Sequence, residues 1–262
     1  MNDKNILNTL GGLSGLTKKD KSSFAIELVN SDFDLSSLKL RTWGAVFQCL
    51  ADAARYKDGY YDISECPEFR KLYASFRTPD SVVSLTKEKA QKIVSNLSSD
   101  SAFSPFFLVP SLTSHDLTPE KQEECMKKIV QVSKEQIFPS HPIMLNFYEQ
   151  KSGISGFITP DKPNELNINL YDNNLRGYLP DVTATIPHEL IHIAQHKMSA
   201  RYAHVDITDR QQTPSDNQVY AAILALNIRL YANPTEANDK RIASSPHKNQ
   251  PLEAEAPGQN HE

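Results

Sequence analysis

Two histidines and a glutamate in the last third of the chain have types and spacing suited to zinc chemistry. His188, Glu189 and His192 form the pattern H-E-x-x-H. On a helix, residues four positions apart lie on one face, so His188 and His192 can direct two imidazoles at a single zinc ion. Bound zinc lowers the pKa of a water molecule toward ~7, and the Glu189 carboxylate could take its proton. The pattern therefore indicates a zinc-dependent hydrolase.

The neighbouring residues predict a helix that packs against a core. Apolar residues recur at helical spacing and form one stripe, namely Ile186, Leu190, Ile193, Ala194 and Met198. Polar residues share another face, namely His188, His192, Gln195 and Ser199. Thr183 or Thr185 is the expected helix cap, which would place Pro187 in the first turn. The alternative is a surface helix with two solvated histidines, and the apolar stripe argues against it.

The composition is typical of one globular domain of ordinary core size. The 262 residues are 39% hydrophobic and 23% charged, with a formal net charge of -4. Because the chain has no dense Lys/Arg patch, we expect no nucleic-acid partner. No stretch approaches the ~18 apolar residues of a membrane span. The cysteines Cys49, Cys66 and Cys125 are scattered, so we expect buried thiols rather than a disulfide framework.

The first residues contain no basic start followed by a long apolar run, so no cleaved signal peptide is expected. We expect the protein to work in a reducing aqueous compartment. This could be the cytoplasm, or a host cell into which the protein is secreted without a cleaved signal. The second possibility would suit a bacterial effector that acts on host proteins.

Patterning along the chain predicts three regions. Residues 1–22 are expected to form a flexible N-terminal arm, and the polar residues 244–262 a disordered tail. Between them we expect a single zincin-like domain over 23–243. Its helical part would cover about 23–140, and the sheet and zinc site about 141–243. Apolar periodicity predicts helices over 35–56, 86–97, 118–138 and 216–231. A short helix is expected over 68–76, within a stretch rich in Gly, Pro and aromatic residues.

Three short segments just before the H-E-x-x-H helix predict a small antiparallel sheet, over 143–148, 154–159 and 166–171. In the last of them, Leu166 and Ile168 alternate with polar residues, so one face should be buried. The expected fold class is therefore α+β, a mostly helical chain with a small antiparallel sheet packed beside the zinc-binding helix.

The H-E-x-x-H motif and a later glutamate resemble the zincin metallopeptidases, in particular the gluzincin branch. In that branch a glutamate on a later helix is the third zinc ligand, and the stretch Tyr231 to Asp239 places Glu236 in that position. The resemblance covers about residues 143–243. It implies a zincin-like fold, one Zn2+, a sheet whose edge strand lines the substrate cleft, and hydrolysis of peptide bonds. The chain departs from thermolysin-like members at Lys240, where they carry an aspartate that orients a histidine.

The residues leave several alternatives open for the third ligand that a catalytic zinc requires. With Asn233 as the helix cap, Glu236 also occupies the capping-box position, which would explain it without a metal. The metzincin pattern is not matched, because a glutamine and a methionine occupy its glycine and histidine positions after His192. His196 lies ~12 Å from His188 along a straight helix, so one zinc cannot bind both. The remaining donors lie on the following loop, at His204, Asp206 and Asp209.

We therefore expect a zinc-dependent endopeptidase that acts on a protein or peptide substrate. His188, His192 and Glu236 would bind the zinc, and Glu189 would act as the general base. Four side chains are candidates for stabilising the oxyanion, namely Tyr202, His204, Tyr220 and Tyr231. One alternative is a non-catalytic interaction protein with a structural zinc. The other is a different zinc amidase, although Cys125 does not match the Gly-Cys context of a deformylase-type ligand.

Overall fold

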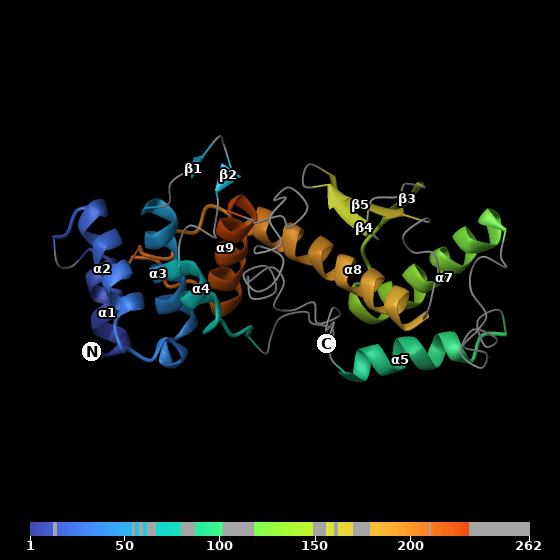
Figure 1. Cartoon of the computed structure of the whole chain (residues 1–262), viewed down its shortest axis with the longest axis horizontal. Coiled ribbons are helices and arrows are strands. Elements are labelled where there is room, and N and C mark those ends of the chain that lie inside the picture. Colours follow the sequence, from blue (N-terminus) through green and yellow to red (C-terminus); the bar gives the residue numbers. More distant parts are fainter. Residues whose placement is uncertain are drawn as a thin grey trace. The chain divides into compact units, whose positions relative to one another are not determined.

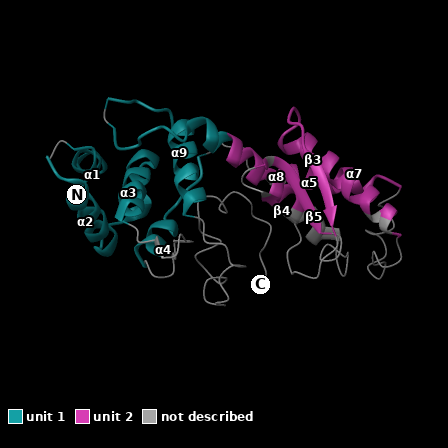
Figure 2. Ribbon diagram, turned by 90° about the horizontal axis from the view of Figure 1, so that it is seen from above, with its two compact units in different colours: residues 1–82, 198–254 teal, residues 83–197, 255–262 magenta. Residues whose placement is uncertain are grey.

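The computed structural model describes eleven parts of the chain, namely 1–12, 15–53, 56–57, 60–61, 67–79, 87–101, 118–148, 156–159, 162–169, 179–209 and 211–230. The chain divides into two compact units (Figures 1 and 2). Unit 1 comprises Met1–Val82 and Met198–Ala254, and unit 2 comprises Val83–Lys197 and Glu255–Glu262. The segment predicted as a single domain, 23–243, thus contributes to both units.

Unit 1 is built from helices around one central helix. Its elements are α1 (Asp3–Leu10), α2 (Lys18–Asn30), η1 (Leu35–Ser37), α3 (Leu40–Ala53), α4 (Pro67–Tyr73), α9 (Asp216–Arg229) and the paired strands β1 (Tyr56–Lys57) and β2 (Tyr60–Tyr61). Helix α3 contacts α1, α2, α4 and α9. Nearly every residue from Thr42 to Leu50 is buried, as expected for a helix surrounded on all sides. Gly44 allows the close approach of α9, since an added Cβ would lie 3.0 Å from Ile223 Cδ1.

The segment predicted as an N-terminal arm, 1–22, contains a short helix. Asp3–Leu10 is a helix, and the Asn2 side chain caps it by accepting a hydrogen bond from the Asn5 amide. Ile6 and Leu10 are fully buried in the core of unit 1. Because these apolar side chains lie one turn apart on the same face, α1 gains enough buried area to stay attached. Helix α2 begins with a capping box between Thr17 and Asp20.

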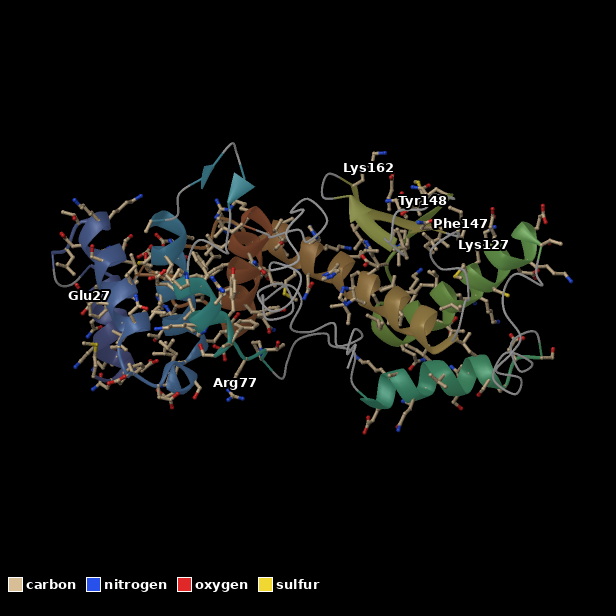
Figure 3. The ribbon with its side chains drawn as sticks, viewed as in Figure 1. Glu27, Arg77, Lys127, Phe147, Tyr148 and Lys162 are labelled. Atoms are coloured by element: carbon tan, nitrogen blue, oxygen red, sulfur yellow. The ribbon has the colours of Figure 1, made fainter. Side chains whose placement is uncertain are left out.

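Unit 2 combines three helices with a three-stranded sheet. Its elements are α5 (Lys87–Ser98), α7 (Pro119–Ile137), β3 (Met144–Tyr148), β4 (Gly156–Thr159), β5 (Lys162–Asn169) and α8 (Leu179–Tyr202), whose last residues belong to unit 1. Leu166 and Ile168 of β5 pack in one core with apolar residues of α7 and α8. On the neighbouring strand, the centre of the Phe147 ring lies 5.5 Å from the Lys127 ammonium of α7 (Figure 3). The sheet and the H-E-x-x-H helix thus contribute apolar side chains to the same core.

The observed strand order corrects the prediction of a purely antiparallel sheet. The order is β3-β5-β4, with β3 parallel and β4 antiparallel to β5. The strands alternate in direction along the chain, but β5 lies in the centre, so the two strands that run the same way become neighbours. Central β5 carries the fully buried pair Leu166 and Ile168. Burial of that pair explains why it occupies the middle of the sheet.

Within the described residues the chain is mostly helical, with eight α-helices and only short strands. The helices predicted over 68–76, 86–97, 118–138 and 216–231 correspond to α4, α5, α7 and α9. The helix predicted over 35–56 is divided into η1 and α3. None of the described helices has both the length and the apolar character needed to cross a lipid bilayer.

The cysteines that the structure describes are buried free thiols, as predicted. Cys49 and Cys125 both lie in the apolar cores. Burial raises the pKa of the Cys49 thiol to about 11, so it stays protonated at neutral pH. Burial likewise raises the pKa of Cys125. Cys66 lies outside the described residues, as does the tail 244–262.

Candidate metal centre

Helix α8 carries the H-E-x-x-H motif in its interior. The helix begins at Leu179, earlier than the cap predicted at Thr183 or Thr185. Pro187 therefore lies inside the helix and not in its first turn, so its ring removes one N–H from the hydrogen-bond ladder just before His188. This position differs from the predicted one in the first turn, where a proline would cost no hydrogen bond.

One side of α8 is fixed by the core of unit 2. Ile186, Leu190 and Ile193 of the predicted stripe are buried there, together with Ile191. Because this apolar side is held against the sheet and α7, the helix cannot rotate without exposing it. The packing thereby fixes the direction in which the histidines project.

The two motif histidines face each other across one turn of α8. The Nε2 atoms of His188 and His192 are 2.9 Å apart, and their ring centroids are 4.4 Å apart with an interplanar angle of 85°. His192 is only 8% exposed. Two nitrogens of one tetrahedral zinc, each at ~2.0–2.1 Å from the metal, lie roughly 3.3 Å apart. The observed spacing is within a few tenths of an ångström of that value, so the pair fits a zinc ion.

A buried glutamine contacts the second ring nitrogen of His192. His192 Nδ1 lies 2.8 Å from Gln195 Oε1, and Gln195 is 2% exposed. With the amide oxygen facing the ring, Nδ1 is the donor, and Nε2 then presents its lone pair toward His188. Metal-binding histidines usually make such a hydrogen bond through the second ring nitrogen. Gln195 occupies the place of such a partner, and the H-E-x-x-H pattern alone did not identify it.

Two further polar residues belong to the same helix. Glu189 follows His188 directly and is partly exposed, so its carboxylate can meet solvent. His196 lies one turn beyond His192 and is also partly buried. Burial lowers the pKa of His196, and the neighbouring His192 lowers it further, so both effects favour a neutral imidazole.

The third ligand is not identified within the described residues. No group of three His, Cys, Asp or Glu side chains there is arranged to hold a metal ion. Glu236, Asp239 and Lys240 lie outside the described residues, so Glu236 stays a prediction. The same holds for Tyr231 as an oxyanion donor. Tyr220, another of those candidates, is fully buried in unit 1, which removes it from contact with a substrate.

The loop with the alternative zinc ligands, 204–209, has its two carboxylates in hydrogen bonds with neighbouring residues. Asp206 Oδ1 accepts hydrogen bonds from the Thr208 amide at 2.8 Å and from Gln48 Nε2 at 3.1 Å. Burial raises the pKa of Asp206, but hydrogen bonds from the Thr208 hydroxyl, the Thr208 amide and Gln48 outweigh burial, and the net pKa is lowered. Asp209 accepts from the Gln211 amide at 2.9 Å. These contacts account for both aspartates without a metal, while His204 is exposed.

A second polar network holds α8 to the sheet. Lys197 Nζ donates to His141 Nδ1 at 2.7 Å, so Nε2 of the same ring carries the proton and donates to Asn164 Oδ1 at 2.6 Å. His141 is buried, and its ring also packs 4.7 Å from Phe138. The sequence showed no partner pattern for His141, because its partners are 23 and 56 positions away.

Lys197→Met should lower the free energy of unfolding by about 1 kcal/mol, because the buried His141 acceptor loses its donor. The matched control is Lys162→Met. That change removes an ion pair with Glu165, in which the lysine side chain is 63% and the glutamate side chain 19% exposed, and should cost less than about 0.5 kcal/mol. Urea unfolding of both variants gives the comparison. Equal losses would show that the Lys197 contact adds nothing beyond ordinary surface electrostatics.

Comparisons of the chain with protein-family models, with curated proteins and with solved structures found no match. The function is therefore inferred from the motif, the geometry of His188 and His192, and the hydrogen bond from His192 to Gln195.

Proposed function

We propose that this protein is a zinc-dependent endopeptidase of the zincin type. The observation that carries the proposal is the 2.9 Å approach of the His188 and His192 Nε2 atoms on one face of α8. The proton that joins these two nitrogens is what a divalent metal would replace, since metal binding requires deprotonated ring nitrogens. The mostly helical fold, with a small sheet that shares its core with α8, supports the zincin-like assignment.

Each residue then has a defined role. His188 and His192 would bind the metal, with Gln195 holding His192 in the tautomer that frees Nε2. When bound, zinc supplies an acidified water and polarises the scissile carbonyl. Glu189 would accept the proton of the attacking water and pass it to the leaving amine. Glu236 is the proposed third ligand, which completes the three protein ligands of a catalytic zinc.

The first test measures metal and activity on the same preparation. The purified protein should contain about one zinc per chain, which a chelator removes and added zinc restores. Incubation of the zinc form with a proteome should generate new N-termini that disappear on chelation. A preparation that takes up no zinc at neutral pH would overturn the proposal.

The same experiment distinguishes an endopeptidase from the two alternative functions. An interaction protein with a structural zinc would contain the metal but generate no new N-termini, and removing the metal would unfold it. Another zinc amidase would likewise leave proteins uncut, while hydrolysing small amides in a zinc-dependent way. Only the endopeptidase combines zinc content with reproducible cleavage sites in proteins.

A further inference from the structure

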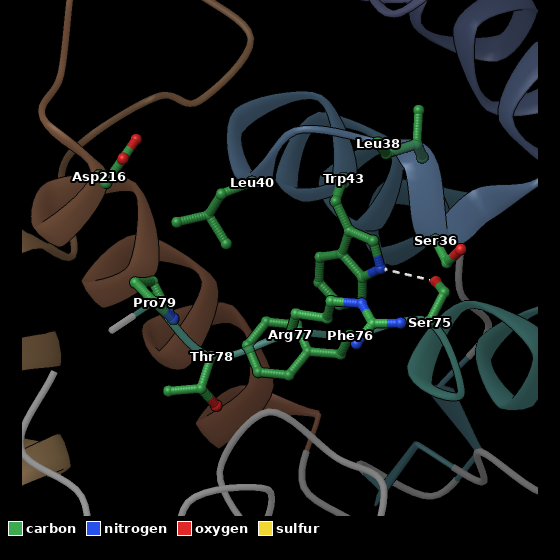
Figure 4. A pocket seen from close by; sticks show the side chains of 10 residues that line it. All are labelled: Ser36, Leu38, Leu40, Trp43, Ser75, Phe76, Arg77, Thr78, Pro79 and Asp216. Carbon is green, nitrogen blue, oxygen red and sulfur yellow. Dashed lines mark hydrogen bonds between the residues drawn. The ribbon is translucent and has the colours of Figure 1, made fainter. Parts of the chain in front are cut away.

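Unit 1 contains a pocket that is separate from the histidine pair and has no role in the proposed hydrolysis. Its volume is about 470 Å³, which is within the range of small-molecule sites. Residues of α3, of the segment after α4 and of the start of α9 line it (Figure 4). The lining combines an apolar wall with two opposite charges, and both features restrict what could bind there.

The apolar wall is held in place before any ligand arrives. Trp43 Nε1 donates to the Leu72 carbonyl at 3.2 Å and to Ser75 Oγ at 3.0 Å. The Trp43 ring packs against Phe76, with centroids 4.8 Å apart, and Phe76 stacks on the buried Tyr220 at 6.3 Å. These contacts fix the indole and phenyl rings, so little side-chain entropy would be lost when a ligand packs on them.

The charges of the pocket come from Arg77 and Asp216, which lie on different sides of it (Figure 4). Both side chains are exposed. Within the described parts of the chain, Arg77 takes part in no ion pair or hydrogen bond. None of the described residues occupies the N–H donors of its guanidinium, whose planar geometry matches the two oxygens of a carboxylate.

We propose that this pocket binds a monocarboxylate that carries a branched or aromatic apolar group. The carboxylate would pair with Arg77, while the apolar group would pack on Phe76, Leu38 and Leu40. A second negative charge at the far end would approach Asp216, so dicarboxylates should bind more weakly. The same chemistry occurs in free short-chain acids and in the C-terminal residue of a peptide, and the experiment distinguishes these two sources.

Trp43 provides the readout, because it is the single tryptophan of the chain and lines the pocket. Titration with 4-methylpentanoate should change its fluorescence saturably, with a Kd on the order of 1 mM for a ligand of this size. The neutral 4-methylpentanamide should bind about tenfold more weakly, because it cannot form the charge-assisted pair. Glutarate, which has a second carboxylate, should also bind more weakly than 4-methylpentanoate.

Acetyl-Ala-Leu and its C-terminal amide distinguish the source. Tighter binding of acetyl-Ala-Leu than of 4-methylpentanoate, lost on amidation, would assign the pocket to peptide C-termini. Tighter binding of the free acid would assign it to small carboxylates. The proposal is overturned if neither acid gives a saturable change, or if acids and amides bind equally.

Variants of the arginine test the charge directly. Arg77→Gln should weaken 4-methylpentanoate binding about tenfold, and Arg77→Lys should weaken it less, since lysine keeps the charge but loses the fork. Arg229→Gln is the matched control, because Arg229 is an exposed arginine of the same unit outside the lining. Thermal melts confirm that each variant is folded. Unchanged affinity in folded Arg77→Gln would overturn the proposal.

Discussion

Glu189→Gln should reduce peptide hydrolysis by about 10²–10⁴-fold while leaving zinc content and fold unchanged. Glutamine has nearly the same shape as glutamate but cannot accept the proton of an attacking water. Because Glu189 is partly exposed, the substitution buries no new polar group. The measurement is kcat on a peptide chosen from the proteome cleavage sites, with zinc content determined on the same sample.

Glu124→Gln is the control for this substitution, since Glu124 is an exposed glutamate of α7 in the same unit. It should retain wild-type activity and zinc. If Glu189→Gln also cleaves near the wild-type rate, the general base lies elsewhere and the proposed mechanism is wrong. Loss of zinc together with activity would instead show that Glu189 contributes to metal binding.

Zinc affinity should separate the proposed ligands from the neighbouring histidine. His192→Ala removes one of the two facing Nε2 atoms, and Glu236→Ala removes the proposed third donor. Each should lower zinc affinity by orders of magnitude, because a three-ligand site loses a direct bond. His196→Ala should have little effect, since one zinc cannot reach both His188 and His196 along the helix. Competition against a fluorescent zinc chelator measures all three variants.

The result for Glu236 has two clear outcomes. If Glu236 is only a helix cap, its replacement should cost about 1 kcal/mol of stability and leave zinc affinity unchanged. Normal zinc in Glu236→Ala with weak zinc in His196→Ala would reject the gluzincin-like ligand set. The third zinc ligand would then have to be another residue. The zinc affinity of His192→Ala would by itself test whether His188 and His192 bind the metal together.

The sequence by itself determined the elements that depend on local periodicity. Helices α5, α7 and α9 and the buried side of α8 follow from apolar residues spaced at one helical turn. The same rule placed His188 and His192 on one face, because a four-residue spacing fixes their relative position on any helix. The chemistry of the motif was readable for this reason, without knowledge of any distant contact.

Only the tertiary structure decided the features that join distant parts of the chain. The alternation of apolar and polar residues predicted three strands. It did not predict that β5 lies in the centre of the sheet with β3 as its parallel neighbour. That order depends on how the sheet buries Leu166 and Ile168. Residues far apart in sequence also meet in three other places. These are the buried face of α1, the hydrogen bond from Lys197 to His141, and the pocket beside Arg77. Such contacts leave no local period in the sequence, because the energy that selects them comes from packing across the whole unit.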